Sequence, residues 1–246
     1  TPRVIDPNNA TDGDLYIALE LLRGAARWND AALAGMAREI GRDILRHTMR
    51  EIGGRRVLLP GARGFEHART IVLNPSYGVV AAWRALDALQ PDPAWARLEA
   101  DHLAMLREAR FGDRMLPPDW LELPRNGGRM APASQWPPRF SFDAVRVPLL
   151  LAWAGQATHP AARAAAAFWA NPGPSYVPAW VDLRDGSLAP FAASAGVIAI
   201  HRLLVAAQRG ERRAVLPEGS VEVDYYSAAL RLLVLLAAQD LEIAAA

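Results

Sequence analysis

The chain has 246 residues, which suits one large domain or two small ones, and hydrophobic residues make up 52% of it, enough for a sizeable core. Its 27 basic residues, all arginine, are scattered among 26 acidic residues, so the net charge of +1 argues against a nucleic-acid-binding surface. The sequence contains no cysteine, which excludes disulfides and thiolate chemistry. No apolar run approaches the roughly 18–20 residues of a membrane span, and residues 1–5 show no signal-peptide pattern.

Apolar residues recur every three or four positions through most of the chain, a spacing typical of amphipathic helices. The pattern predicts about eight helices, separated by proline and glycine breakers, at residues 15–26, 32–45, 76–90, 93–109, 141–155, 160–170, 190–208 and 225–239. Strand-like alternation is scarce, and residues 56–59 are the best strand candidate. We expect one all-α domain over residues 1–246, because no low-complexity linker divides the chain.

An unusual acidic segment at residues 6–14 precedes the first predicted helix. It contains three aspartates and two asparagines. Thr11 or Asp12 could cap the helix, and Asp14 would favour its dipole. Capping explains one acid well, but it does not explain three acids and the asparagine pair. A structural and a functional interpretation of this segment therefore both stay open.

A second acidic position, Asp143, precedes the strongly apolar helix predicted around residues 147–153. Arg146 follows three residues later, on the same face of a helix, so the arginine would hold the carboxylate ionised. Such a carboxylate near loops that carry Trp120 and Trp136 could act as a general base. The alternative is a surface acid that caps this helix and pairs with Arg146, and the residues alone do not decide between the two interpretations.

Other chemistries find little support in the sequence. The five histidines show no metal-ligand spacing, no serine lies in a Gly-x-Ser-x-Gly elbow, and no glycine-rich phosphate loop occurs. We therefore expect neither a metal nor a cofactor. The combination of carboxylates with eight tryptophans and five tyrosines suits a sugar chain, although most aromatic residues of a helical domain belong to its core.

Several of these segments together resemble glycoside hydrolase family 8, and they occur in the order of that family. The matching segments are Ala10-Thr11-Asp12-Gly13-Asp14 with Ile17-Ala18 and Trp28, then Leu73-Asn74-Pro75-Ser76-Tyr77, Pro118-Asp119-Trp120, Phe142-Asp143-Ala144-Val145-Arg146 and Asp224-Tyr225-Tyr226. Glu20 and Gly24 depart from the small residues usual at their positions. The third and fourth segments are similar to those of endo-β-1,4-glucanases that accompany bacterial cellulose synthases.

The resemblance implies an (α/α)₆ barrel with a substrate cleft across one end of its inner helices. It also implies hydrolysis of β-1,4-glucan with inversion, by an acid and a base about 6.5–9.5 Å apart. By this resemblance Asp143 is the general base and Arg146 its orienting partner, while Asp12 binds and distorts the sugar beside the scissile bond. The residues assigned to substrate binding besides Arg146 are Asn74, Tyr77, Trp120 and Tyr225.

The family's general acid is a glutamate upstream of the Ala-Thr-Asp-Gly-Asp segment. Only nine residues precede Ala10, and none is that glutamate. We therefore expect the chain to lack the first helices of the barrel and not to complete an inverting site alone. Glu20 and Glu66 are conceivable substitutes, although their spacing singles out neither.

The resemblance also implies export to the periplasm or secretion, a glucan as substrate and the cellulose synthase complex as a partner. Two alternatives to a cellulase stay open. One is a glucan-binding or scaffold protein without catalysis. The other keeps the fold and changes the substrate to chitosan, xylan or mixed-linkage β-glucan.

Overall fold

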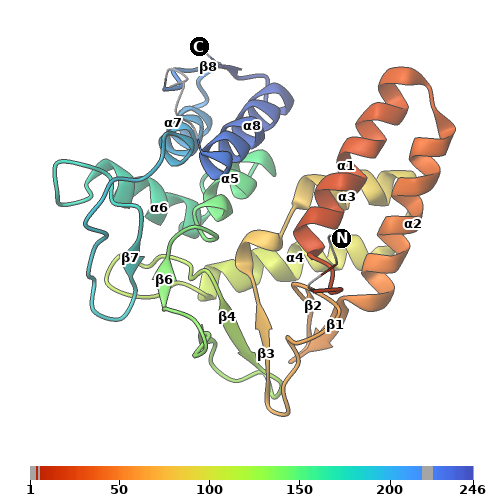
Figure 1. Cartoon of the computed structure of the whole chain (residues 1–246), viewed down its shortest axis with the longest axis horizontal. Helices are drawn as coiled ribbons and strands as arrows, with labels where there is room; N and C mark the ends of the chain where they lie inside the picture. The colour runs from red at the N-terminus through yellow and green to blue at the C-terminus, as the bar shows by residue number, and fades with distance from the viewer. Residues whose placement is uncertain (1–3, 5, 218–223, 246) are drawn as a thin grey trace. The chain divides into compact units, whose positions relative to one another are not determined.

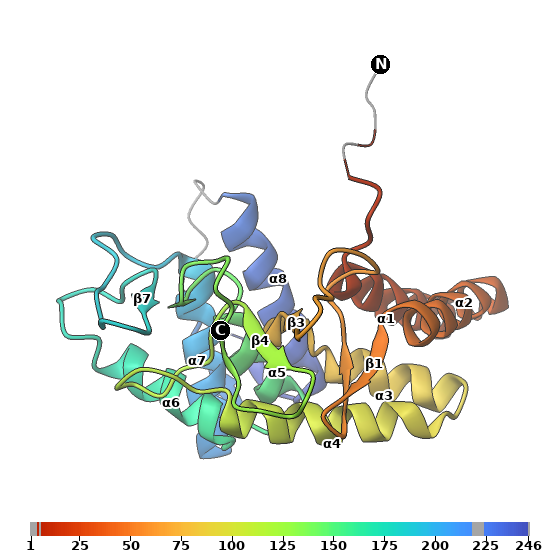
Figure 2. The ribbon, with the colours of Figure 1, turned by 90° about the horizontal axis from the view of Figure 1, so that it is seen from below.

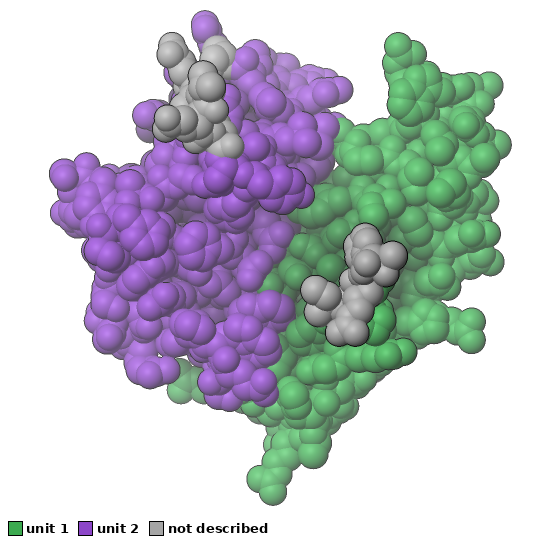
Figure 3. Space-filling model, viewed as in Figure 1, with its two compact units in different colours: residues 1–105, 121–131 green, residues 106–120, 132–246 purple. Residues whose placement is uncertain are grey.

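The computed structural model describes residues 4, 6–217 and 224–245, so most of the opening segment considered for a signal peptide lies outside the described residues. The described part of the chain contains eight α-helices, which confirms the predominantly helical architecture (Figure 1). The chain divides into two compact units, residues 1–105 with 121–131 and residues 106–120 with 132–246, which Figure 3 colours separately. None of the described helices combines the length and hydropathy needed to cross a bilayer.

Helices dominate the first unit. They are α1 (Thr11–Trp28), α2 (Ala31–His47), the short 3₁₀ helix η1 (Pro75–Tyr77), α3 (Val80–Leu89) and most of α4 (Pro93–Glu108). Asp30 caps α2 by accepting a hydrogen bond from Ala32 N at 2.8 Å. The helices α1 and α2 run side by side in both ribbon views (Figures 1 and 2). Gly41 brings α2 close to α3, since a Cβ there would lie 2.9 Å from Leu86 Cδ2.

Short strands complete this unit. The strands β1 (Met49–Ile52) and β2 (Arg55–Leu58) form a hairpin around Gly53 and Gly54, which confirms the predicted strand with a shift of one residue. A second antiparallel pair, β3 (Thr70–Leu73) and β4 (Leu121–Pro124), was not predicted, and β5 (Ala131–Pro132) adds to its β4 edge. The β3 strand leads directly into η1 and thereby places Tyr77.

The second unit is built around four helices. They are α5 (Arg146–Trp153), α6 (Pro160–Ala170), α7 (Ala195–Arg209) and α8 (Tyr225–Asp240), with strands β6 (Arg139–Phe140), β7 (Val181–Asp182), β8 (Arg213–Ala214) and β9 (Ala244–Ala245). Every residue of α5 from Val147 to Trp153 is buried. Gly196 allows α7 to approach α8, because a Cβ there would lie 2.7 Å from Ser227 O. This close approach places the first turn of α8.

Candidate active site

The segment ahead of α1 is fastened to a neighbouring loop of the first unit. Asn8 accepts a hydrogen bond from Arg63 N at 3.1 Å and donates one to Arg63 O at 2.9 Å, while Asn9 Oδ1 accepts from Ala62 N at 2.8 Å. Gly61 permits this approach, since a Cβ there would lie 2.6 Å from Asn9 O. The asparagine pair, which helix capping did not explain, therefore has a structural role.

The capping interpretation of Thr11 and Asp12 is wrong. Ala10 occupies the cap position of α1, and no side chain caps the helix. Thr11 begins the helix with its side chain turned into the core, where the fully buried hydroxyl donates to Leu59 O at 2.7 Å. Asp12 is partly exposed in the first turn, and its Oδ1 accepts from Gly13 N at 2.9 Å. Its charge lies where the helix dipole favours an anion.

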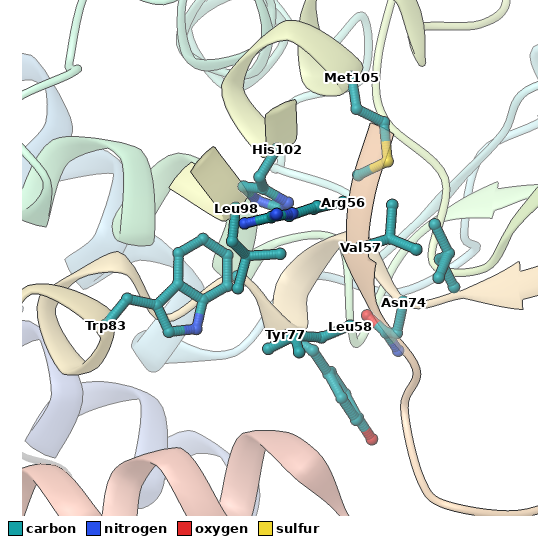
Figure 4. Close-up of a pocket in the computed structure, with 11 residues that line it drawn as sticks. Arg56, Val57, Leu58, Asn74, Tyr77, Trp83, Leu98, His102 and Met105 are labelled. Carbon is teal, nitrogen blue, oxygen red and sulfur yellow. The ribbon is translucent and has the colours of Figure 1, made fainter. Parts of the chain in front are cut away.

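Asn74 and Tyr77 occupy the turn formed by η1. Asn74 is only 5% exposed, and its Oδ1 accepts hydrogen bonds from Ser76 N at 3.0 Å and Ser76 Oγ at 2.7 Å. The two residues border a cavity of about 20 Å³ that Trp83 and His102 also line, and the Tyr77 ring points away from His102 (Figure 4). This cavity has room for one water molecule and not for a sugar. Asn74 thus holds the turn that presents Tyr77, and sugar contact by either residue stays a prediction.

The predicted pairing of Asp143 with Arg146 is present in the second unit. Arg146 Nη2 lies 2.6 Å from Asp143 Oδ1, with 17% of the arginine side chain and 31% of the aspartate side chain exposed. The prediction that Asp143 caps the following helix is wrong, because α5 has Val145 in its cap position and no side-chain cap. Asp143 lies in the preceding turn, which Arg146 N closes by donating to Asp143 O at 3.0 Å.

A further carboxylate, Asp119, lies against the same turn. Its Oδ1 accepts hydrogen bonds from the backbone N–H groups of Ser141 at 3.1 Å, Asp143 at 3.1 Å and Ala144 at 2.7 Å, and its Oδ2 accepts from the Ser141 hydroxyl. Burial raises the pKa of Asp119 from 3.8 to about 6; the hydrogen bonds from Ser141 and Ala144 oppose this rise, and the charge of Asp143 adds to it. Asp119 therefore binds a proton at a higher pH than an ordinary aspartate does.

Tyr226 contacts the turn from helix α8. Its hydroxyl donates to Phe142 O at 2.9 Å, and its ring meets the Phe142 ring edge-on at 5.6 Å. Burial raises the pKa of the Tyr226 phenol far above its usual value, an effect that the charge of Arg146 opposes. The phenol is therefore a hydrogen-bond donor throughout the physiological pH range. Its neighbour Tyr225, predicted to line the cleft, is 90% exposed, and its contact with a sugar stays a prediction.

Two tryptophans stack on each other in the second unit. The rings of Trp120 and Trp136 stack with their centroids 4.7 Å apart and their planes 15° from parallel, and both residues are partly exposed. Ala133 N donates to Trp120 O at 2.9 Å and ties the two loops together. The outer face of such a stacked pair suits the apolar face of a pyranose ring. Trp136 was not assigned to the site from the sequence.

Neither glutamate considered as a substitute acid has a suitable environment. Glu20 is exposed and lies 3.4 Å from Arg23. Glu66 lies 2.9 Å from Arg50 and 3.2 Å from Arg125, and the hydrogen bond from Arg50 is the main cause that lowers its pKa. A general acid at neutral pH needs a raised pKa, whereas the pKa of Glu66 is lowered. Both glutamates are better described as surface ion-pair partners.

Comparison with known sequences decides the family. Residues 1–240 match the profile of glycosyl hydrolases family 8. The chain belongs to this family. A probable endoglucanase of Novacetimonas hansenii is 40% identical over 236 residues, which cover 96% of the chain and 68% of that protein. An endoglucanase of Cellulomonas uda is 38% identical over 211 residues, which cover 85% of the chain and 58% of that protein.

Solved structures agree with the family 8 assignment. The crystal structure of an endoglucanase from Komagataeibacter sucrofermentans has a TM-score of 0.87 and 40% identity, and the match covers 95% of this chain and 72% of that one. The helical family 8 fold that the motifs predicted is therefore confirmed. The chain spans 58% of the length of the Cellulomonas uda protein.

Two residues that contact the turn around Asp143 were missed from the sequence, although both lie within the motifs that carried the resemblance. Asp119 is the centre of Pro118-Asp119-Trp120, of which only the tryptophan was assigned a role. Tyr226 follows Tyr225, and the two could have been distinguished by helical phase. Ser227, Leu230 and Val234 mark the buried face of α8, and Tyr226 lies beside that face, whereas Tyr225 projects into solvent.

Proposed function

We propose that this family 8 chain belongs to an endo-β-1,4-glucanase that acts with inversion, and that Asp143 is its general base. The carrying observation is the 2.6 Å ion pair between Asp143 and Arg146, on a turn just before a buried helix, in a chain whose relatives are named endoglucanases. In an inverting reaction the base takes a proton from water as the water oxygen attacks the anomeric carbon. A second carboxylic acid gives its proton to the leaving oxygen on the opposite face.

The ion pair suits Asp143 to this step. Arg146 stabilises the negative charge, so the carboxylate is ionised and ready to accept a proton. It also fixes the position of one carboxylate oxygen, which helps to orient the other towards a bound water. We further propose that Asp12 binds the sugar beside the scissile bond and that Tyr77 and Asn74 bind the same sugar. Trp120 and Tyr225 are proposed to contact the glucan as well.

The proposal is tested in the full-length protein by measuring new reducing ends and the loss of viscosity on carboxymethyl cellulose. Asp143→Asn is expected to lower kcat by about 10²–10⁴-fold, the usual contribution of a general base. A matched control is Asp101→Asn, because Asp101 also accepts from an arginine, Arg97 Nε, at 2.7 Å. Unchanged turnover in Asp143→Asn would show that another residue is the base.

Two further measurements address the stereochemistry and the alternatives. Proton NMR of the first product should show the α-anomer before mutarotation, since inversion at a β-linkage yields α. Binding of cello-oligosaccharides without any hydrolysis would instead favour a glucan-binding protein. Faster cleavage of chitosan, xylan or mixed-linkage β-glucan than of cellulose derivatives would change the substrate.

We also propose, from the family resemblance, that the protein is exported to the periplasm or secreted and works beside a cellulose synthase. Fractionation of cells that produce the full-length protein checks its location. Retention of the synthase on the immobilised protein checks the partnership. Recovery of the protein in the cytoplasm would contradict the first part, and release of the synthase at low salt would contradict the second.

A further inference from the structure

The peptide unit that joins Phe142 to Asp143 is held on both sides by side chains from distant parts of the chain. Its carbonyl oxygen accepts a hydrogen bond from the Tyr226 hydroxyl at 2.9 Å, and its N–H donates to Asp119 Oδ1 at 3.1 Å. We propose that Asp119 and Tyr226 are positioning residues, which fix this peptide and so orient the Asp143 carboxylate for catalysis. The inference rests on the proposed role of Asp143 as general base.

The geometry explains why these two contacts control the carboxylate. The direction of the Cα–Cβ bond of Asp143 follows from the orientation of its two flanking peptides. The preceding peptide is held by Asp119 and Tyr226, and the following one has its carbonyl oxygen bonded to Arg146 N at 3.0 Å. Arg146 then holds the carboxylate itself at 2.6 Å. Because misplacement by about 1 Å can cost roughly 10²-fold in rate, such support is expected around a catalytic base.

The charges around the turn add a second role for Asp119. The groups that act on one another there are the carboxylates of Asp119, Asp143 and Asp224, the guanidinium of Arg146 and the phenol of Tyr226. Asp119 lies against the turn that carries Asp143, and the negative charge of each carboxylate opposes ionisation of the other. Ionised Asp119 therefore makes Asp143 a stronger base. Because Asp119 takes up its own proton below about pH 6, its charge acts on Asp143 only above that pH, and removing it should abolish a pH-dependent step in activity near pH 6.

The experiment uses the full-length protein and two single variants. Tyr226→Phe removes one hydroxyl and should lower kcat by about 3- to 10-fold, with KM within about twofold and the acidic limb of the pH profile unmoved. Asp119→Asn should lower kcat and remove the step near pH 6 that the ionisation of Asp119 adds to the wild-type pH profile. Loss of a merely structural contact would lower kcat without removing that step.

Matched controls exist in the same unit. Tyr176→Phe removes a hydroxyl that donates to Ala189 O at 2.9 Å, and Asp182→Asn changes a carboxylate that accepts from Arg184 N at 2.8 Å. Both controls should keep the wild-type kcat and pH profile. Circular dichroism verifies folding. If Asp119→Asn does not fold, Tyr226→Phe still tests whether catalysis depends on holding the peptide between Phe142 and Asp143.

Each outcome decides a specific claim. Wild-type kcat in Tyr226→Phe, or a loss of kcat no larger than that of Tyr176→Phe, would overturn the positioning role of Tyr226. A kcat loss in Asp119→Asn that leaves the step near pH 6 in place would overturn its electrostatic role. If Asp143→Asn is as active as the wild type, the proposed function fails first. If that variant is inactive while the two positioning variants behave normally, only the present inference fails.

Discussion

Replacing Asp119 by asparagine is expected to stabilise the folded protein at alkaline pH, although the same change weakens catalysis. Burial raises the pKa of Asp119 from 3.8 to about 6, so its ionised form is less favourable in the folded than in the unfolded protein. One pKa unit corresponds to about 1.4 kcal/mol, and a shift of this size costs up to roughly 3 kcal/mol once the carboxylate is charged. Asparagine removes the charge and keeps an oxygen that can accept from Ala144 N.

The sign of the pH dependence follows from which state binds the proton first. Below pH 3.8 Asp119 is protonated in both states and contributes no difference in free energy of unfolding. As the pH falls from about 6 to 3.8, the folded protein takes up the proton before the unfolded one does, so this carboxyl makes the wild type more stable. The advantage of Asp119→Asn should therefore be largest above pH 6 and disappear towards acid.

Urea unfolding of the wild type and Asp119→Asn at about pH 4 and about pH 8 measures this difference directly. Asp182→Asn serves as the control, since Asp182 is a partly exposed residue at the end of β7 that accepts from Arg184 N at 2.8 Å. An Asp119→Asn protein that is less stable than the wild type at the higher pH would refute the reasoning. So would a gain in stability of the same size at both pH values.

Two further predictions concern the elements that place the site. Gly196→Ala should destabilise the protein by about 1–3 kcal/mol, because its Cβ would lie 2.7 Å from Ser227 O. Gly35→Ala should instead stabilise the protein by up to about 1 kcal/mol, because nothing lies within 4 Å of its Cβ and alanine favours the helix. Equal melting temperatures would contradict this. Thr11→Val removes the buried hydroxyl bonded to Leu59 O and should destabilise by about 1–3 kcal/mol in denaturant unfolding, while Thr11→Ser keeps most of the stability.

Local patterns predicted the helices well, and the errors lie where tertiary contacts decide. Helix α6 was predicted at its observed bounds, Pro160–Ala170. Helix α5 was predicted from residue 141 but begins at Arg146, because the intervening turn bonds to Asp119, more than 20 residues away. The β3–β4 pair was missed because each strand has four residues and its partner lies about 50 positions away. Periodicity over so short a run carries little information.

The same distinction applies to the candidate site. The pairing of Asp143 with Arg146 could be predicted because it depends on a spacing of three residues. The contacts of Asp119 and Tyr226 with the turn span 24 and 84 residues, and no local pattern contains them. The capping predictions failed for a related reason. Thr11 fits a cap by residue type, but its hydroxyl bonds to Leu59 O, 48 residues away.

Asp119 and Asp143 differ in their surroundings, and the difference indicates different roles. Asp119 accepts four hydrogen bonds, three on Oδ1 and one on Oδ2, and a carboxylate offers about four acceptor positions. Its acceptor capacity is therefore largely used within the protein, and it is poorly placed to take a proton from a substrate water. Asp143 keeps 31% of its side chain exposed beside Arg146. Asp119 carries a charge that lowers stability, accepts most of its hydrogen bonds from the turn and adjoins an accessible carboxylate, so it is best explained as support for Asp143.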